Sequence, residues 1–97
     1  MKNLEEIKTI IQSRKAEIKD KYNVAEIGVF GSFVNSRSRK KHDLDILVTF
    51  SKPIGLFKFI EFEEYLTELV GIKVDLVTKL GLKPRIGEYI LKEVQYL

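Results

Sequence analysis

The chain has 97 residues, of which 44% are hydrophobic and 32% are charged, and its formal net charge is +3. It contains no cysteine and a single histidine, His42, which excludes a disulfide framework, a thiolate metal site and a histidine-based zinc centre. No apolar run approaches the ~20 residues that a membrane-spanning helix needs. We therefore expect residues 1–97 to form one soluble domain, in which any metal site uses oxygen ligands.

The N-terminal segment is charged and amphipathic, unlike a secretory signal, so we expect a cytoplasmic protein. Apolar residues recur at helical spacing from Leu4 to Ile18. This period predicts one helix that reaches about Lys21 and is broken by Asn23.

The next segments alternate between strand and helix patterns. Residues 24–30 and 44–50 are rich in β-branched and aromatic residues, so they predict two strands separated by a basic loop. A second helix is predicted from about Phe57 to a stop near Gly71, and a third strand over residues 73–78.

Pro84 is placed to begin a last helix, whose apolar stripe is formed by Ile86, Ile90 and Val94. This order of elements predicts an α+β fold, in which a small mixed β-sheet is covered by helices.

A Gly-Ser pair ends the first predicted strand. Gly31 allows the backbone to turn tightly and to approach a phosphate closely. Ser32 can cap a helix whose free N–H groups face an anion. The pair is therefore a candidate binding site for the phosphates of a nucleotide.

An Asp-x-Asp begins the second predicted strand. Asp43 and Asp45 are two residues apart, so their side chains leave the same face, roughly 6–7 Å apart at the backbone. Two carboxylates at this spacing suit Mg²⁺, which combines a few carboxylates with waters and phosphate oxygens.

A third acid, Asp75, lies within the third predicted strand between Val74 and Leu76. Aspartate is depleted in strands, and an ionised carboxylate among apolar neighbours is costly unless it is paired or bound to metal. If the third strand lies beside the second, Asp75 joins the first two acids around one cavity, as in two-metal phosphoryl transfer. The alternative is a set of strand-end acids that face water or pair with lysines.

Much of the positive charge is concentrated between the Gly-Ser pair and the first aspartate, at Arg37, Arg39, Lys40 and Lys41. This cluster is a solvated loop, an aid to binding a triphosphate, or a contact with an acidic or RNA-like partner. No aromatic residue lies among these charges, so nucleic acid is not expected as a direct ligand. His42 is either a loop residue or a contact with phosphate or substrate.

These residues resemble a known family. The pattern of Gly31-Ser32, ten further residues, Asp43-x-Asp45 and the strand acid Asp75 is similar to that of the minimal nucleotidyltransferases, the MNT or MntA-like branch of the DNA polymerase β-type nucleotidyltransferase superfamily. The resemblance covers nearly the whole chain and includes Leu82-Lys83-Pro84-Arg85 before the last helix.

The resemblance implies the polymerase β-like nucleotidyltransferase fold and a site for each ligand. Gly31 and Ser32 are implied to bind the triphosphate of ATP, the co-substrate. Asp43 and Asp45 are implied to bind Mg²⁺, with two ions expected in the site. Asp75 is implied to complete the metal site or to activate the acceptor hydroxyl.

The resemblance also implies a partner. Proteins of this branch occur as antitoxins paired with HEPN-domain ribonucleases, and some transfer AMP from ATP to a tyrosine of the toxin. We expect the same here, with the HEPN partner completing the open site. Two alternatives remain: a non-catalytic antitoxin that neutralises the toxin by binding it, and a nucleotidyltransferase for a small molecule such as an aminoglycoside.

Overall fold

The computed structural model describes residues 3–31, 43–81 and 84–97. Its elements in chain order are α1 (Leu4–Ser13), α2 (Lys15–Tyr22), β1 (Val24–Phe30), β2 (Leu44–Phe50), α4 (Leu56–Val70), β3 (Val74–Thr78), the short 3-10 helix η1 (Lys79–Gly81), α5 (Pro84–Glu93) and β4 (Gln95–Tyr96).

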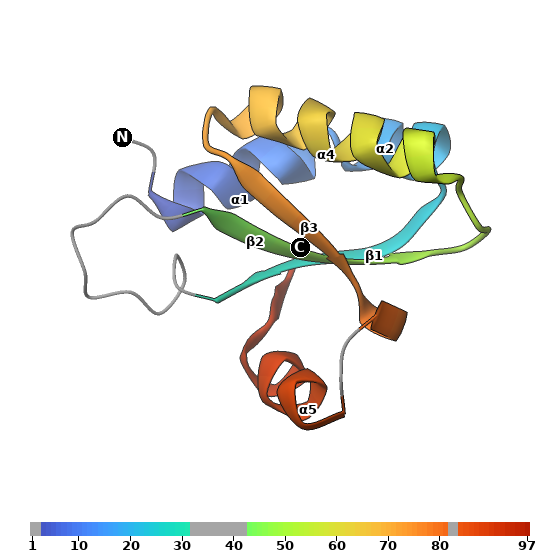
Figure 1. Ribbon diagram of the computed structural model, residues 1–97. Helices are drawn as coiled ribbons and strands as arrows, with labels where there is room; N and C mark the ends of the chain where they lie inside the picture. Colours follow the sequence, from blue (N-terminus) through green and yellow to red (C-terminus); the bar gives the residue numbers. More distant parts are fainter. Residues whose placement is uncertain (1–2, 32–42, 82–83) are drawn as a thin grey trace.

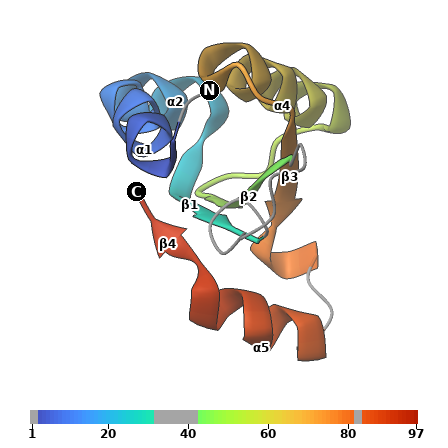
Figure 2. The same cartoon turned by 90° about the vertical axis from the view of Figure 1, so that its left-hand side faces the viewer.

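The strands form one four-stranded sheet in the order β3-β2-β1-β4. β1 pairs antiparallel with both β2 and β4, whereas β2 and β3 are parallel, so the sheet is mixed. Helices α1, α2 and α4 lie on one face of the sheet, and α5 lies on the opposite side (Figures 1 and 2). The predicted α+β fold with a small mixed sheet is confirmed.

The core lies between the sheet and the three helices on its first face. Leu44, Ile46 and Val48 of β2 are fully buried there. Tyr22 of α2 stacks on Phe62 of α4 with ring centroids 4.5 Å apart. Because side chains alternate along a strand, Asp45 and Leu47, which lie between the three buried residues of β2, point to the other face, toward the side where α5 lies.

The N-terminal segment contains two helices, so the prediction of a single helix to about Lys21 was wrong. Arg14 leaves the helical conformation, with φ −108° and ψ 7°. Its N–H bonds the carbonyl of Ile11 at 3.0 Å, and the Ser13 hydroxyl donates to the carbonyl of Ile10 at 2.6 Å. The one-residue break barely alters the phase of the apolar residues, so the sequence period could not reveal it.

The predicted helix ends are confirmed. Asn23 caps α2 in the left-handed conformation, with φ 55°. Gly71 does the same for α4 with φ 74°, and its N–H bonds the carbonyl of Thr67 at 2.9 Å. None of the helices in the described part of the chain is long and apolar enough to cross a membrane.

The edge strand β4 was not predicted, because two residues carry no periodic signal. It is held in place by contacts from distant parts of the chain. The N–H of Leu97 bonds the carbonyl of Ile27 at 2.9 Å. The Lys15 ammonium donates to the carbonyl of Leu97 at 2.7 Å, and that of Lys8 donates to the Gln95 side chain at 3.2 Å.

Candidate active site

Gly31, the residue after β1, lies directly against the carboxylate of Asp45. Its φ of +83° is in the region that favours glycine, and a Cβ built at this position would collide with Oδ2 of Asp45. The contact follows from the sheet, because Phe30 at the end of β1 pairs with Asp45 of β2. Glycine is therefore required here by both backbone conformation and space.

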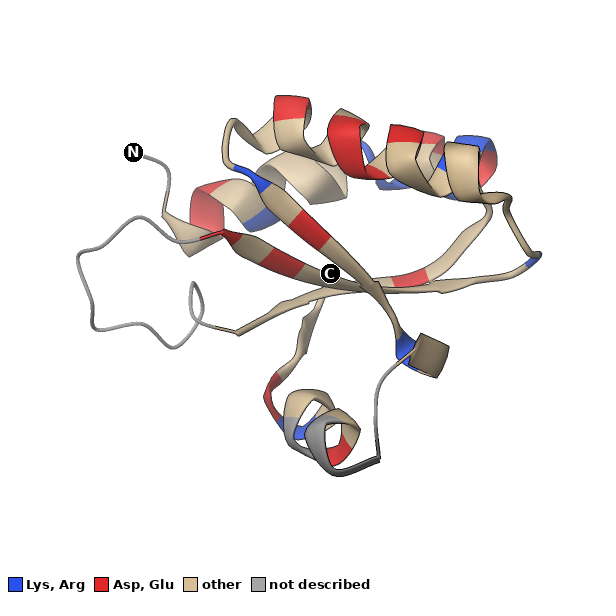
Figure 3. Cartoon of the chain, viewed as in Figure 1, with Lys and Arg blue, Asp and Glu red and all other residues tan. Residues whose placement is uncertain are grey.

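Asp45 and Asp75 are brought together by the parallel pairing of β2 with β3. The register places these two residues directly opposite each other, and both are half-buried. Acidic segments lie side by side on the two strands in Figure 3. The expectation that the third strand lies beside the second is confirmed, and with it the proximity of the two acids.

The electrostatic environment of Asp45 disfavours its charge. Burial raises the pKa of this carboxyl, and the negative charges of Asp75 and then Asp43 raise it further. A cation at this position would offset the repulsion among the three carboxylates.

Asp43 lies just before β2, and its side chain is 41% exposed. Its Oδ2 lies 3.8 Å from the ammonium of Lys73, whose side chain is 69% exposed. The N–H of Leu44 also bonds the carbonyl of Lys73 at 2.8 Å, which ties the starts of the two strands together. An ion pair this exposed is weak, so it leaves the Asp43 carboxylate accessible to other cations.

The three acids fit Mg²⁺ in their chemistry but not in their arrangement. The three carboxylates supply the oxygen donors that Mg²⁺ prefers, on one face of the sheet. Across residues 3–31, 43–81 and 84–97, however, no group of three or more His, Cys, Asp or Glu residues is arranged so that it could hold a metal ion. The donor chemistry fits Mg²⁺, while the side chains are not gathered around a single point.

Several predicted contributors lie outside the described residues. These are Ser32, the basic cluster Arg37, Arg39, Lys40 and Lys41, and the single histidine, His42. The contact of Lys73 with Asp43 was missed from sequence. The parallel register would have revealed it, because Leu44 pairs with Val74 and the preceding residues are therefore neighbours.

Comparison with known proteins places this site in a family. A relative from Thermococcus cleftensis, named protein adenylyltransferase MntA, is 47% identical over 97 residues, which is all of this chain and 98% of the relative. A solved structure provisionally described as a minimal nucleotidyltransferase is 31% identical, with a TM-score of 0.74, and the match covers 94% of this chain and 95% of that one.

Two more distant solved structures share the fold. One is a toxin–antitoxin complex with AMP-PNP, with a TM-score of 0.70, 17% identity, and coverage of 88% of this chain and 69% of that one. The other is a tri-AMPylated HEPN toxin from Shewanella oneidensis in complex with an MNT antitoxin, with a TM-score of 0.67, 16% identity, and coverage of 93% and 70%.

The family described as "Nucleotidyltransferase domain" matches residues 5–97. This match and the relative at 47% identity agree with the recognition made from the Gly-Ser and Asp-x-Asp motif. The chain therefore belongs to the nucleotidyltransferase domain family and is a nucleotidyltransferase.

Proposed function

We propose that this protein is a protein adenylyltransferase, which transfers AMP from ATP to a tyrosine of a HEPN-type toxin and thereby acts as its antitoxin. The name of the relative at 47% identity supports the reaction. The AMPylated HEPN toxin bound to an antitoxin of the same fold supports the partner, and the AMP-PNP complex supports the nucleotide. The single observation that carries the proposal is the opposition of Asp45 and Asp75, with Gly31 against the Asp45 carboxylate.

Each residue has a role in this proposal. Gly31 and Ser32 bind the triphosphate through their backbone N–H groups, since the close approach of Gly31 to the Asp45 carboxylate brings this part of the backbone next to the metal ligands. Asp43 and Asp45 hold Mg²⁺, with Asp75 as the third acid of the site. When bound, Mg²⁺ neutralises phosphate charge and orients the triphosphate.

The transfer itself is a displacement at phosphorus. The tyrosine oxygen forms a bond to the α-phosphorus of ATP, and the bond from that phosphorus to the bridging oxygen breaks, so pyrophosphate leaves with the electron pair. The proton of the tyrosine hydroxyl passes to Asp75, which lies half-buried on the same face as Asp45.

The proposal is tested by incubating the protein with its purified HEPN partner, ATP and Mg²⁺ and weighing the partner by intact mass spectrometry. We expect the mass of the partner to rise by that of one or more AMP groups. Asp43→Asn should largely abolish the transfer, because a ligand for Mg²⁺ is lost. Asp20→Asn, a matched change at an exposed acid of α2, should leave the rate unchanged.

Two results would contradict the adenylyltransferase proposal, and a third would contradict only the role of Asp43. Tight binding of the partner without any gain in mass would identify a steric antitoxin. Transfer of a nucleotide to an aminoglycoside, with none to the partner, would identify an enzyme for small molecules. Unchanged transfer by Asp43→Asn would show that this acid plays no part in holding the metal.

A further inference from the structure

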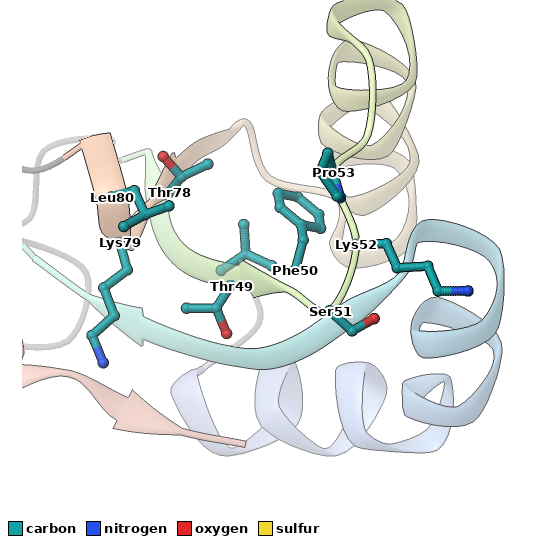
Figure 4. Close-up of a pocket in the computed structure, with 9 residues that line it drawn as sticks. Thr49, Phe50, Ser51, Lys52, Pro53, Thr78, Lys79 and Leu80 are labelled. Carbon is teal, nitrogen blue, oxygen red and sulfur yellow. The ribbon is translucent and has the colours of Figure 1, made fainter.

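A cavity of about 300 Å³ lies at the opposite end of β2 and β3 from the three acids. The end of β2 and the following turn form one side, and the end of β3 with η1 forms the other (Figure 4). Its volume is near the lower end of the range for ligand pockets, about 300–1,000 Å³. It is lined by Val48, Thr49, Phe50, Ser51, Lys52, Pro53, Thr78, Lys79 and Leu80.

The side chains at this end are unusually apolar for a protein surface. Leu80, which lines the cavity, is 99% exposed. Phe57 and Leu56, in the first turn of the helix that follows Pro53, are 87% and 70% exposed. Exposed apolar side chains are typical of a surface that binds another macromolecule when they form a continuous patch, and Leu80 supplies such a side chain at the cavity itself.

The three hydroxyl groups of the lining are already engaged within the chain. The Ser51 hydroxyl donates to the carbonyl of Asn23 at 3.2 Å, and the Thr78 hydroxyl accepts from the N–H of Gly81 at 3.1 Å. The Thr49 hydroxyl donates to the carboxylate of Glu26 at 3.4 Å. A small neutral ligand that needs these hydroxyls would therefore find few free partners here, whereas an apolar side chain needs none.

The charges of the cavity favour an acidic neighbour. Lys52 and Lys79 are exposed and lie on opposite sides of the cavity, with their ammonium groups directed outward (Figure 4). None of the nine lining residues is acidic, and the Glu26 carboxylate beside the lining accepts from the Thr49 hydroxyl. An apolar group that enters the cavity with carboxylates beside it would complement both lysines.

We propose that this cavity is the docking site for an acidic segment of the HEPN-type partner, which inserts an apolar side chain between Pro53 and Leu80. The identity of the partner rests on the proposed function; the chemistry of the segment rests on the cavity. Asp45 and Thr49 are four residues apart on one strand, about 13 Å. A partner anchored at this end can therefore present a tyrosine at the acids from the same interface.

Calorimetric titration with the purified HEPN partner tests the proposal. Leu80→Asp should weaken binding at least about tenfold, because a charge replaces an apolar contact, while Leu80→Met should bind like the wild type. Lys79→Glu should weaken binding several-fold at low salt and less at high salt. Lys19→Glu, at an exposed lysine of α2, is the matched control and should have no effect.

These variants are suited to the test because the altered side chains contribute little to the fold. Leu80 is almost fully exposed, so Leu80→Asp should keep the thermal stability of the wild type and its affinity for a non-hydrolysable ATP analogue with Mg²⁺. A change in either property would assign the effect to folding or to the nucleotide site, and would overturn the docking role of Leu80.

The outcomes separate this proposal from the enzymatic one. If the wild type binds the partner and Leu80→Asp binds equally well, the docking site is wrong, whether or not AMP is transferred. If binding depends on Leu80 while no AMP is transferred, the docking site stands and the adenylyltransferase proposal fails. If the wild type does not bind the HEPN partner, both proposals about the partner fail.

Discussion

Ionised Asp45 destabilises the folded chain, because the carboxylate is partly buried and faces two other acids. Burial, then Asp75, then Asp43 raise its pKa above the ordinary value of 3.8. The folded state thus binds the proton more tightly than the unfolded state. The loss of folding stability caused by the ionised carboxylate is fully present above the raised pKa. It disappears as the pH falls through that pKa and below the ordinary value.

We predict that Asp45→Asn raises the melting temperature of the metal-free protein by about 2–5 °C near neutral pH. The gain should shrink toward zero as the pH falls to about 3, below the ordinary pKa, where the wild-type carboxyl is mostly protonated in both states. Thermal unfolding of both proteins in a chelator, followed by circular dichroism across this pH range, measures the difference. A lower melting temperature for Asp45→Asn near neutral pH would show that the carboxylate stabilises the fold.

At the residue scale, the spacing of residues in the sequence predicts which side chains share a face, because this depends only on the geometry of one strand. The shared face of Asp43 and Asp45 follows from the two-residue period of a strand. The approach of Gly31 to the Asp45 carboxylate could not be predicted, because it depends on the antiparallel register between β1 and β2. The same limit applies to Lys73, whose contact with Asp43 depends on the parallel register of β3.

At the scale of elements, side chains of α4 accept hydrogen bonds from N–H groups at the outer edge of the sheet. β3 is an edge strand, and unpaired N–H groups on such a strand invite pairing with another chain. Two of these groups have side-chain partners on α4. The N–H of Leu76 donates to the Glu63 carboxylate at 2.9 Å, and that of Val74 donates to the Thr67 hydroxyl at 3.1 Å. These bonds also fix the strand segment that carries Asp75.

We predict that Glu63→Ala destabilises the protein by about 1–3 kcal/mol, because the N–H of Leu76 loses its acceptor. Glu63→Gln should lose less, since its amide oxygen can still accept the bond. Glu64→Ala, at the exposed neighbour, should be nearly neutral. Urea unfolding gives the three free energies, and equal values for Glu63→Ala and Glu64→Ala would show that water replaces the carboxylate without cost.

The main elements could be predicted because their periods are local. The bounds expected for β1 and β2 match the observed strands, and Pro84 begins α5 as expected. The break at Arg14 and the short β4 depend instead on tertiary contacts. No local pattern encodes them, so reasoning from the sequence could not find them.

At the scale of the whole molecule, the two faces of the sheet have different tasks. One face packs against α1, α2 and α4 and contains the main hydrophobic core. The other carries the acids and faces the side of α5, whose chain returns to the sheet through β4 (Figure 2). The attachment of β4 to β1 therefore helps to determine where α5 lies relative to the acids.

Gly28 of β1 is the position at which this attachment can be tested. A Cβ built there would lie 2.7 Å from Cγ2 of Val94 and 3.0 Å from the carbonyl oxygen of Gln95. The first contact is with the end of a side chain, but the second is with backbone, which can yield only if β4 moves. We predict that Gly28→Ala destabilises the protein by about 1–3 kcal/mol through overpacking. It should also speed amide exchange at Leu97, whose N–H bonds the carbonyl of Ile27.

In Gly28→Ala, amide hydrogen exchange in the middle of α4 should change little compared with exchange at Leu97. The buried residues of α4, Phe62 and Leu66, pack on the opposite face of the sheet from α5. Gly55→Ala is the control for an added Cβ that meets no atom within 4 Å; because Gly55 is the N-cap of α4, any effect belongs to the start of that helix, and exchange at Leu97 should not change. Hydrogen exchange read by mass spectrometry or NMR gives both measurements. Equal acceleration at Leu97 and in α4 would mean that β4 unfolds only with the whole chain, and the two faces of the sheet would then be one cooperative unit.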